Sequence, residues 1–331
     1  MPPVHQPLGS DSTAPDRKLL QNIRYLVVTV ILALLLGTVL YQLARALFFR
    51  FNQAIQQLTS IPLLPTLTQL SSGLVSIVGF GVPLLALYLM LKNTFSFRSL
   101  IHRSNEAELL HAIAIALGVL AIGTLLTDIS SDFLGLFQIK LLKSDILIPD
   151  GFLPLLLFLC NYILITPILE ELLFRGIILQ LFRRFGDLFA LVISTLFYVM
   201  TEETYTSFIP TFLFGIVAGY FVLHSRSIFT GMLMHTFYNL VIVILSIFTS
   251  ALEPNAAMTT QITLFLILIA AFVVAVIRFL CKGKEPFSIA ENAAGSTLTL
   301  SARFKAALCN PAFILFALVF LYRLLQLVQI L

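Results

Sequence analysis

Long runs of apolar residues, separated by short polar stretches, dominate the pattern along this chain. A run of about 20 apolar residues is long enough to cross a bilayer as a helix. The windows that approach or exceed this length are residues 23–47, 70–91, 109–126, 152–170, 187–201, 206–223, 227–248, 262–280 and 309–328. This pattern predicts an all-α, polytopic bundle of about eight to nine transmembrane helices. The window 187–201 is short and the window 309–328 contains Arg323, so these two decide the count.

The polar stretches between the windows suggest how the chain is organised. Residues 1–22 are polar and contain several prolines, which predicts a disordered tail. Residues 23–69 are interpreted as a first transmembrane helix followed by a surface loop or interfacial helix, and residues 70–280 as one compact helical membrane domain. A polar, Ser/Thr/Ala-rich linker is expected at 281–308, before a C-terminal hydrophobic anchor helix at 309–331. The first and last spans are thus expected to be additions to the central domain.

Composition agrees with a multi-pass membrane protein. The 331 residues are 59% hydrophobic and only 11% charged, whereas soluble domains carry about 25% charged residues. The net charge of +4 does not indicate a nucleic-acid partner, because Lys and Arg in membrane proteins mostly set orientation. Placing the N-terminus in the cytosol puts fifteen of the 20 Lys and Arg residues on the cytosolic side. We therefore expect a cytosolic N-terminus, and interpret the chain as a protein of the cytoplasmic (inner) membrane.

Two adjacent carboxylates and an arginine interrupt an apolar stretch that begins near Pro167, in the sequence Glu170-Glu171-Leu172-Leu173-Phe174-Arg175. A charge near the bilayer centre costs about 2.5–3.5 kcal/mol on insertion scales, so such residues usually face a bundle interior or a cavity. Glu171 and Arg175 share a helix face at i,i+4, while Glu170 projects about 100° away. One interpretation is a structural ion-pair cluster at a helix end. The other is a free Glu170 that acts as a general base.

A second polar pair lies in the window 227–248. His235 and Asn239 are spaced i,i+4 and therefore share one face of the predicted helix. They could form the interhelical hydrogen bonds that are common in membrane bundles. Alternatively, both side chains could converge on one small polar target.

Taken together, the sequences Glu170-Glu171-x-x-x-Arg175 and His235-x-x-x-Asn239 resemble the first and last motifs of the CPBP family. These are the CAAX-protease and bacteriocin-processing (Abi) intramembrane glutamate proteases. The resemblance implies that Glu170 is the general base that activates a water, and that Glu171 with Arg175 orients the site. It further implies that His235 and Asn239 donate hydrogen bonds to the oxyanion of the scissile carbonyl.

The resemblance covers about residues 152–245 and contains one departure from the family pattern. The family's middle motif, FxxxH, corresponds here to Phe197-Tyr198-Val199-Met200-Thr201, so the histidine position reads Thr201. Threonine can orient a water but cannot accept its proton near neutral pH. Glu202 and Glu203 follow, and we interpret them as acids of a short outer turn at 201–207 rather than as substitute bases.

Three accounts of the departure remain open at this stage. Glu170 works with Thr201 or Glu202 in a weakened hydrolase, or the chain has kept the fold and lost proteolysis, or the motif alignment is shifted. The first account predicts an endopeptidase that cleaves membrane-associated or lipidated proteins or peptides within the lipid bilayer. The second predicts a binding, regulatory or bacteriocin-immunity protein. A small transporter that uses the buried charges as a substrate or proton path is a third function class.

The implied glutamate mechanism requires no cofactor. If a divalent metal were used, Glu170 and His235 would be its ligands, which is a small set because catalytic zinc usually takes three protein ligands. The windows also place Glu170 near the inner end of one span and Thr201 near the outer end of the next. These positions conflict with a site that both residues share. A shared site therefore requires Pro167 to break its helix or the spans to shift.

Overall fold

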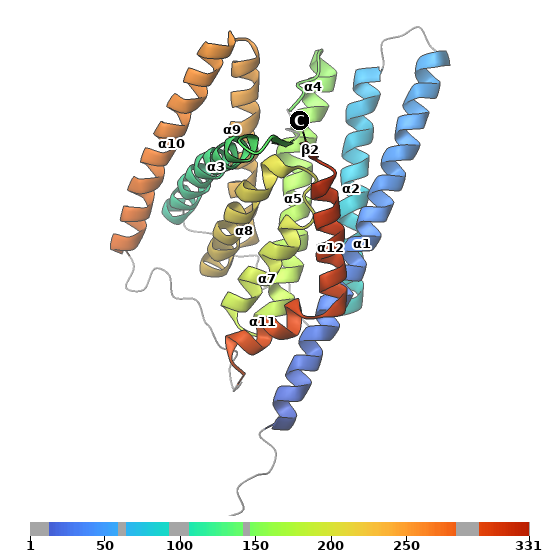
Figure 1. Ribbon diagram of the computed structural model, residues 1–331, viewed down its shortest axis with the longest axis vertical. Helices are drawn as coiled ribbons and strands as arrows, with labels where there is room; N and C mark the ends of the chain where they lie inside the picture. The colour runs from blue at the N-terminus through green and yellow to red at the C-terminus, as the bar shows by residue number, and fades with distance from the viewer. Residues whose placement is uncertain (1–12, 59–63, 93–105, 142–145, 283–297, 331) are drawn as a thin grey trace, which may run out of the picture.

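The computed structural model describes residues 13–58, 64–92, 106–141, 146–282 and 298–330 (Figure 1). These residues form an almost entirely helical bundle, as the apolar pattern predicted. Two segments, η2 and η3, are π-helical. The elements in chain order are α1 (Thr13–Leu58), α2 (Leu64–Leu91), α3 (Glu106–Gly135), β1 (Ile139–Leu141), α4 (Phe152–Leu159), η2 (Cys160–Ile165), α5 (Thr166–Glu171), η3 (Leu172–Ile178), α6 (Leu179–Arg183), α7 (Asp187–Val199), α8 (Tyr205–Ser225), α9 (Ile228–Ser250), α10 (Pro254–Lys282), α11 (Leu300–Leu308), α12 (Pro311–Leu325) and β2 (Val328–Ile330).

Within the described ranges, seven helices are long and apolar enough to cross a membrane, or eight if α11 and α12 together make one span bent by 65°. The chain is therefore a multi-pass membrane protein. The expected count of eight to nine is close, and the window 187–201 accounts for the difference. It forms α7, which has only 13 residues and is shorter than the bilayer core requires.

Helix α1 is longer at both ends than the sequence pattern suggested. It begins at Thr13, so residues 13–22 are helical rather than part of a disordered tail. The reason is that Leu19 and Leu20 pack against the hydrophobic core. At the other end the helix continues to Leu58, and buried Asn52 donates a hydrogen bond to Ser71 of α2 at 3.2 Å. Residues 1–12 of the expected tail lie outside the described residues.

The expected polar linker at 281–308 is also partly helical. Helix α10 continues to Lys282, and α11 begins at Leu300, while residues 283–297 lie outside the described residues. Arg303 of α11 is fully buried, and its guanidinium donates to the carbonyl of Phe185 at 2.8 Å. The polar composition of this segment therefore did not indicate α11, a short helix that contacts the bundle through buried polar groups.

The C-terminal helices are part of the core rather than a separate anchor. Phe304 of α11 packs against Phe189 of α7, and Phe313 and Phe316 of α12 pack against Phe197, with ring centroids 5.1–6.4 Å apart. Asn310 caps α12 and also donates to the carbonyl of Arg24 in α1 at 3.1 Å. The last helix is thereby joined to both α7 and α1.

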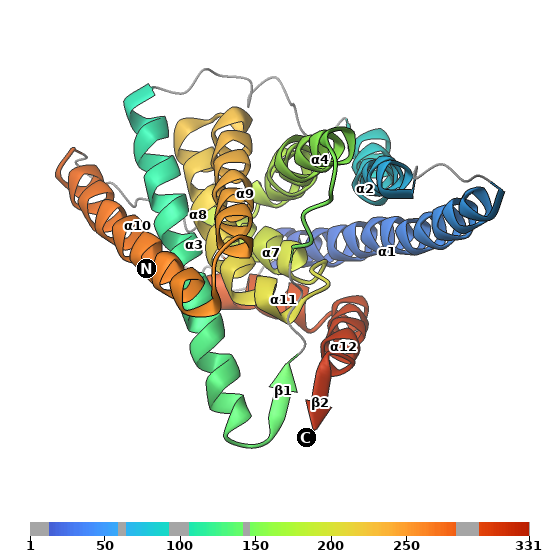
Figure 2. The same ribbon diagram turned by 90° about the horizontal axis from the view of Figure 1, so that it is seen from above.

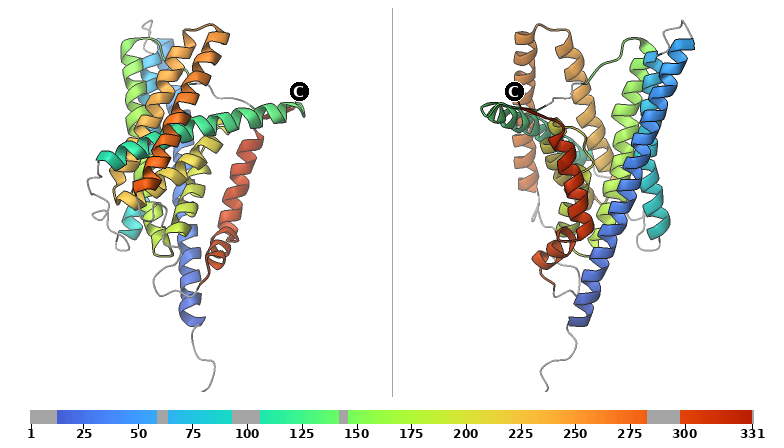
Figure 3. Two further views of the ribbon diagram at one scale, coloured as in Figure 1. Left: turned by 90° about the vertical axis from the view of Figure 1, so that its left-hand side faces the viewer. Right: turned by 45° about the vertical axis from the view of Figure 1, so that its right-hand side comes forward.

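The irregular span made of α4, η2, α5, η3 and α6 lies near the centre of the bundle (Figures 1 and 2). Helix α2 packs along one side of this span and α9 along another, while α7 packs on α6 and α8 packs on α7 and α9. Outside this centre, α1 pairs with α2 and α10 pairs with α3, which crosses its neighbours at a steep angle (Figure 3). A short antiparallel ladder, with Ile139 opposite Ile330, joins the chain after α3 to the C-terminal residues.

Candidate active site

The helix that carries the two glutamates is locally widened around Pro167. The backbone N–H of Thr166 donates to the carbonyl of Asn161, five residues earlier, as in a π turn. The carbonyl of Tyr162 therefore loses its usual partner Thr166, and its π-helical partner would be Pro167, which has no N–H. Asn239 of α9 supplies the missing donor, with Nδ2 2.8 Å from the Tyr162 carbonyl. Single-turn π segments are frequent at functional sites, and here one accounts for the position of Asn239.

Glu171 is completely enclosed and paired. Arg175 Nη1 donates to Glu171 Oε1 at 2.8 Å, as the i,i+4 spacing predicted. His235 Nδ1, from α9, lies 3.2 Å from the same oxygen. The guanidinium of Arg175 also lies over the ring of Tyr198, with Cζ 4.4 Å from its centroid, which is a cation–π geometry. Glu171 therefore holds α5 to α9 and is not available to a substrate.

Gly231 of α9 makes this close approach possible. A Cβ atom at this position would lie 2.7 Å from Glu171 Oε2 and 2.9 Å from Val222 Cγ2. These distances are shorter than real Cβ contacts allow. Only glycine therefore lets α9 approach the buried carboxylate without displacing it.

Replacing Gly231 with Ala is expected to lower the free energy of unfolding by about 1–3 kcal/mol, because the added methyl overpacks a fixed charged group. Thermal unfolding of the purified protein in detergent measures this. The matched control is Gly135→Ala, because nothing lies within 4 Å of the Cβ that this change adds. Equal stability of the two variants would contradict the expected role of Gly231.

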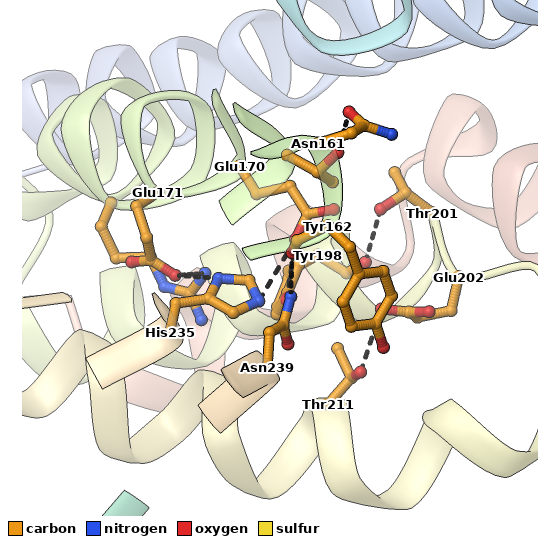
Figure 4. Close-up of polar contacts among 12 residues, drawn as sticks. Asn161, Tyr162, Glu170, Glu171, Tyr198, Thr201, Glu202, Thr211, His235 and Asn239 are labelled. Atoms are coloured by element: carbon orange, nitrogen blue, oxygen red, sulfur yellow. Dashed lines mark hydrogen bonds and ion pairs between the residues drawn. The ribbon is translucent and has the colours of Figure 1, made fainter. Parts of the chain in front are cut away.

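Glu170 is held differently from Glu171. Tyr198 Oη donates to Glu170 Oε2 at 3.0 Å, and His235 Nε2 lies 3.8 Å from the same oxygen (Figure 4). The side chain of Glu170 is 13% exposed, whereas that of Glu171 is 0% exposed. The imidazole of His235 thus lies between the two carboxylates, with one ring nitrogen toward each. If Nδ1–H donates to ionised Glu171, Nε2 is the nitrogen left to face Glu170.

Glu170 opens into a cavity of about 240 Å³. The cavity is bounded by α1, α2, α5, the turn after α7, and α12, including Tyr41, Thr166 and Arg323. Thr201 and Glu202 line it as well, so the inner and outer positions expected for Glu170 and Thr201 are reconciled. The short α7 explains this, because Glu170 and Thr201 lie at similar distances along the chain from the turn between α6 and α7.

Four of the six predicted residues lie together, and the other two have separate contacts. Glu170, Glu171, Arg175 and His235 form one connected polar cluster. Asn239 lies one turn along α9 and contacts the Tyr162 carbonyl, so it does not share a target with His235. Thr201 lines the cavity, and its hydroxyl donates to the Tyr198 carbonyl of its own chain segment at 2.7 Å.

The donor set does not fit a metal centre. Among the residues that the structure describes, no three His, Cys, Asp or Glu side chains lie close enough together to hold a metal ion. Glu171, the carboxylate nearest to the Glu170–His235 pair, is already bonded to Arg175 and His235 through Oε1. We therefore derive no catalytic step through a metal.

Sequence reasoning missed two contributions to the site. Tyr198, which holds Glu170, lies inside the middle motif, directly after Phe197, and could have been found there. Tyr41 of α1 and Arg323 of α12 form part of the cavity wall. Both helices were expected to be additions to the central domain, and no local sequence pattern indicates that they line the site.

A comparison with known families now places this part of the chain. A family model described as Type II CAAX prenyl endopeptidase Rce1-like matches residues 152–241. No curated protein and no solved structure matches the chain. The match begins with α4 and ends within α9, so it contains all six predicted site residues: Glu170, Glu171, Arg175, Thr201, His235 and Asn239. The resemblance indicated by the motifs is thus confirmed for residues 152–241, which match the Rce1-like family model.

Proposed function

We propose that this protein is a CAAX-type intramembrane endopeptidase in which Glu170 activates the water that hydrolyses a peptide bond. The observation that carries the proposal is the different placement of the two adjacent carboxylates. Glu171 is enclosed and bonded to Arg175 and His235, while Glu170 reaches the cavity. General base catalysis needs such a carboxylate, within reach of a water and not neutralised by an arginine.

Tyr198 and His235 position the proposed base. The hydroxyl of Tyr198 bonds one oxygen of Glu170 and restricts its rotation. His235 is fixed by its bond to Glu171, and its Nε2 faces the same carboxylate oxygen. After Glu170 takes a proton from water, hydroxide attacks the scissile carbonyl and negative charge develops on its oxygen.

His235 and Asn239 are the proposed donors to that oxyanion. For His235 this role needs the imidazolium form, in which Nδ1–H stays bonded to Glu171 and Nε2–H is donated to the oxyanion. Such donors act best when they are fixed in advance, and removing one typically costs about 2.7–4 kcal/mol of transition-state stabilisation. Asn239 is fixed by its bond to the Tyr162 carbonyl and has a second amide N–H, and His235 is fixed by Glu171. Thr201, at the cavity wall, can accept a hydrogen bond from the water that Glu170 activates.

The proposed substrate is a membrane-associated or lipidated protein or peptide, reached from the bilayer. We further propose that the chain lies in the cytoplasmic membrane with its N-terminus in the cytosol, because this orientation places most of its Lys and Arg residues on the cytosolic side.

A direct test uses the purified full chain in liposomes and a synthetic peptide that ends in a prenylated CaaX sequence. Digestion in H₂¹⁸O, followed by mass spectrometry, is expected to show loss of the last three residues and one ¹⁸O in the new carboxyl group. An intact peptide after prolonged incubation with folded protein would contradict the proposed activity on this substrate class.

A second candidate function rests on Thr201, which replaces the histidine of the family's middle motif. Under this alternative the chain is an inactive family member that binds or regulates a membrane protein, or gives bacteriocin immunity. It predicts that Glu170→Gln leaves the cellular phenotype intact. Proteolysis predicts that the phenotype is lost at unchanged protein abundance.

A further inference from the structure

Glu202 does not occupy the exposed outer-turn position that its sequence context suggested. Its carboxylate accepts a hydrogen bond from Thr211 Oγ1 of α8 at 2.9 Å, and it lines the cavity together with Glu170 (Figure 4). Glu203 is the acid that behaves as expected for an outer turn. It is 38% exposed and forms ion pairs with Arg45 and Arg323. Both acids line the cavity, but Glu203 is paired with arginines and Glu202 is bonded to a threonine.

Glu170 and Glu202 share a confined space. The negative charges of the two carboxylates are close enough to repel one another. Groups from the surrounding elements that interact electrostatically with Glu202 are Glu170, Tyr162, Tyr198, Tyr238, Glu203 and Arg323. The net charge around the cavity is thus negative, since Arg323 already pairs with Glu203. Two like charges that face one cavity disfavour ionisation of both carboxyls at once.

For Glu202 to act as an acid, it must be the protonated member of the pair. Burial favours this form because it raises the pKa of the Glu202 carboxyl above the ordinary value, while the hydrogen bond from Thr211 opposes this increase. A neutral carboxyl group can donate a proton, which threonine at position 201 cannot do near neutral pH.

We propose that Glu202 is the second catalytic carboxyl of this cavity and takes the place of the histidine that is missing at position 201. This inference rests on the proposed endopeptidase function and adds a further residue to it. The observation that supports it is geometric, because Glu202 immediately follows Thr201, faces the same cavity as Glu170, and is held there by Thr211.

The proposed hydrolysis begins with Glu170 ionised and Glu202 protonated. Ionised Glu170 takes a proton from water, and the oxygen of the resulting hydroxide forms a bond to the scissile carbonyl carbon. Glu202 gives its proton to the amide nitrogen as the C–N bond breaks, so an amine and a carboxylic acid leave. Glu170 is then protonated and Glu202 ionised, and transfer of one proton from Glu170 to Glu202 restores the starting state.

The test compares Glu202→Gln with wild type in the liposome peptide assay, over a range of pH. We expect kcat to fall by about 10²-fold or more, as for loss of a general acid. Wild-type activity requires Glu170 ionised and Glu202 protonated, so it should rise and then fall with pH, and the fall at high pH should be absent in the variant. Glu253→Gln, in the exposed loop between α9 and α10, is the matched control.

Two further variants separate a catalytic role from a structural one. The double variant Thr201→His/Glu202→Gln should have a kcat at least tenfold higher than Glu202→Gln alone, because histidine returns a proton-carrying group to the motif position. Thr211→Val removes a hydrogen bond that lowers the pKa of Glu202, so the decline at high pH should move to higher pH. This second measurement remains informative if Glu202→Gln fails to fold.

Each result has a distinct meaning. A Glu202→Gln variant with wild-type kcat and an unchanged pH profile would overturn the role of Glu202 while leaving the proposed function intact. The same holds for an unchanged profile in Thr211→Val. If the folded wild-type protein cleaves no peptide, the proposed function fails and this inference fails with it.

Discussion

Replacing Glu170 with Gln is expected to lower kcat/KM for peptide cleavage by about 10²- to 10⁴-fold, the usual range for loss of a general base. Glutamine keeps the size of the side chain and can still accept the hydrogen bond from Tyr198 Oη, so folding should be preserved. It cannot accept a proton from water. The measurement is the cleavage rate of the prenylated peptide by equal amounts of folded wild-type and variant protein.

Thermal unfolding in detergent provides the necessary comparison for this variant. Glu170→Gln should unfold within a few degrees of wild type, and the exposed Glu253→Gln should match wild type in both stability and rate. A folded Glu170→Gln protein that cleaves at the wild-type rate would eliminate Glu170 as the base.

The second large effect concerns stability. Removing the guanidinium of Arg175 by substitution with Ala should lower the free energy of unfolding by about 3–5 kcal/mol, because it leaves the carboxylate of Glu171 buried without its cation. Arg175 is 2% exposed and Glu171 0% exposed, so water cannot replace the lost bond. Thermal unfolding of the purified protein, with the exposed Arg278→Ala as control, measures the difference.

A double-mutant cycle shows whether this loss belongs to the pair. Glu171→Ala combined with Arg175→Ala should cost much less than the sum of the two single changes, because the double variant buries no unpaired charge. Additive losses, or a loss below about 1 kcal/mol for Arg175→Ala, would mean that the ion pair does not hold α5 in place.

Local spacing was enough to predict part of the site. The i,i+4 relation of Glu171 and Arg175 depends only on helix geometry, and the structure confirms their pairing. The same rule placed His235 and Asn239 on one face of α9. It could not show that their targets differ, because this follows from the π turn that frees the Tyr162 carbonyl.

The walls of the cavity could not be predicted in this way. Tyr41 and Arg323 are far apart in the sequence and reach the cavity because α1 packs on α2 and α12 packs on α1. Hydropathy identified both helices but carries no information on which helices become neighbours. Helices α1 and α12, which were expected to be additions to the central domain, therefore form part of the wall of the candidate site.

The short turn after α7 shows a related limit. The sequence pattern suggested that Glu202 and Glu203 are equivalent outer acids. Both line the cavity, yet Glu202 accepts a hydrogen bond from Thr211, whereas Glu203 pairs with Arg45 and Arg323. Adjacent residues in a turn point in different directions, and only the tertiary contacts decide which of them is enclosed.

The central claim is that the protein hydrolyses membrane-associated substrates through Glu170, and cells provide its most direct test. Cells that contain wild-type protein or Glu170→Gln at matched abundance are compared by mass spectrometry of the chain termini of their membrane proteins. The account predicts new termini that are present with wild type and absent with the variant. Identical termini, in cells where the wild-type protein still has a phenotype, would contradict proteolysis and favour the inactive binding protein.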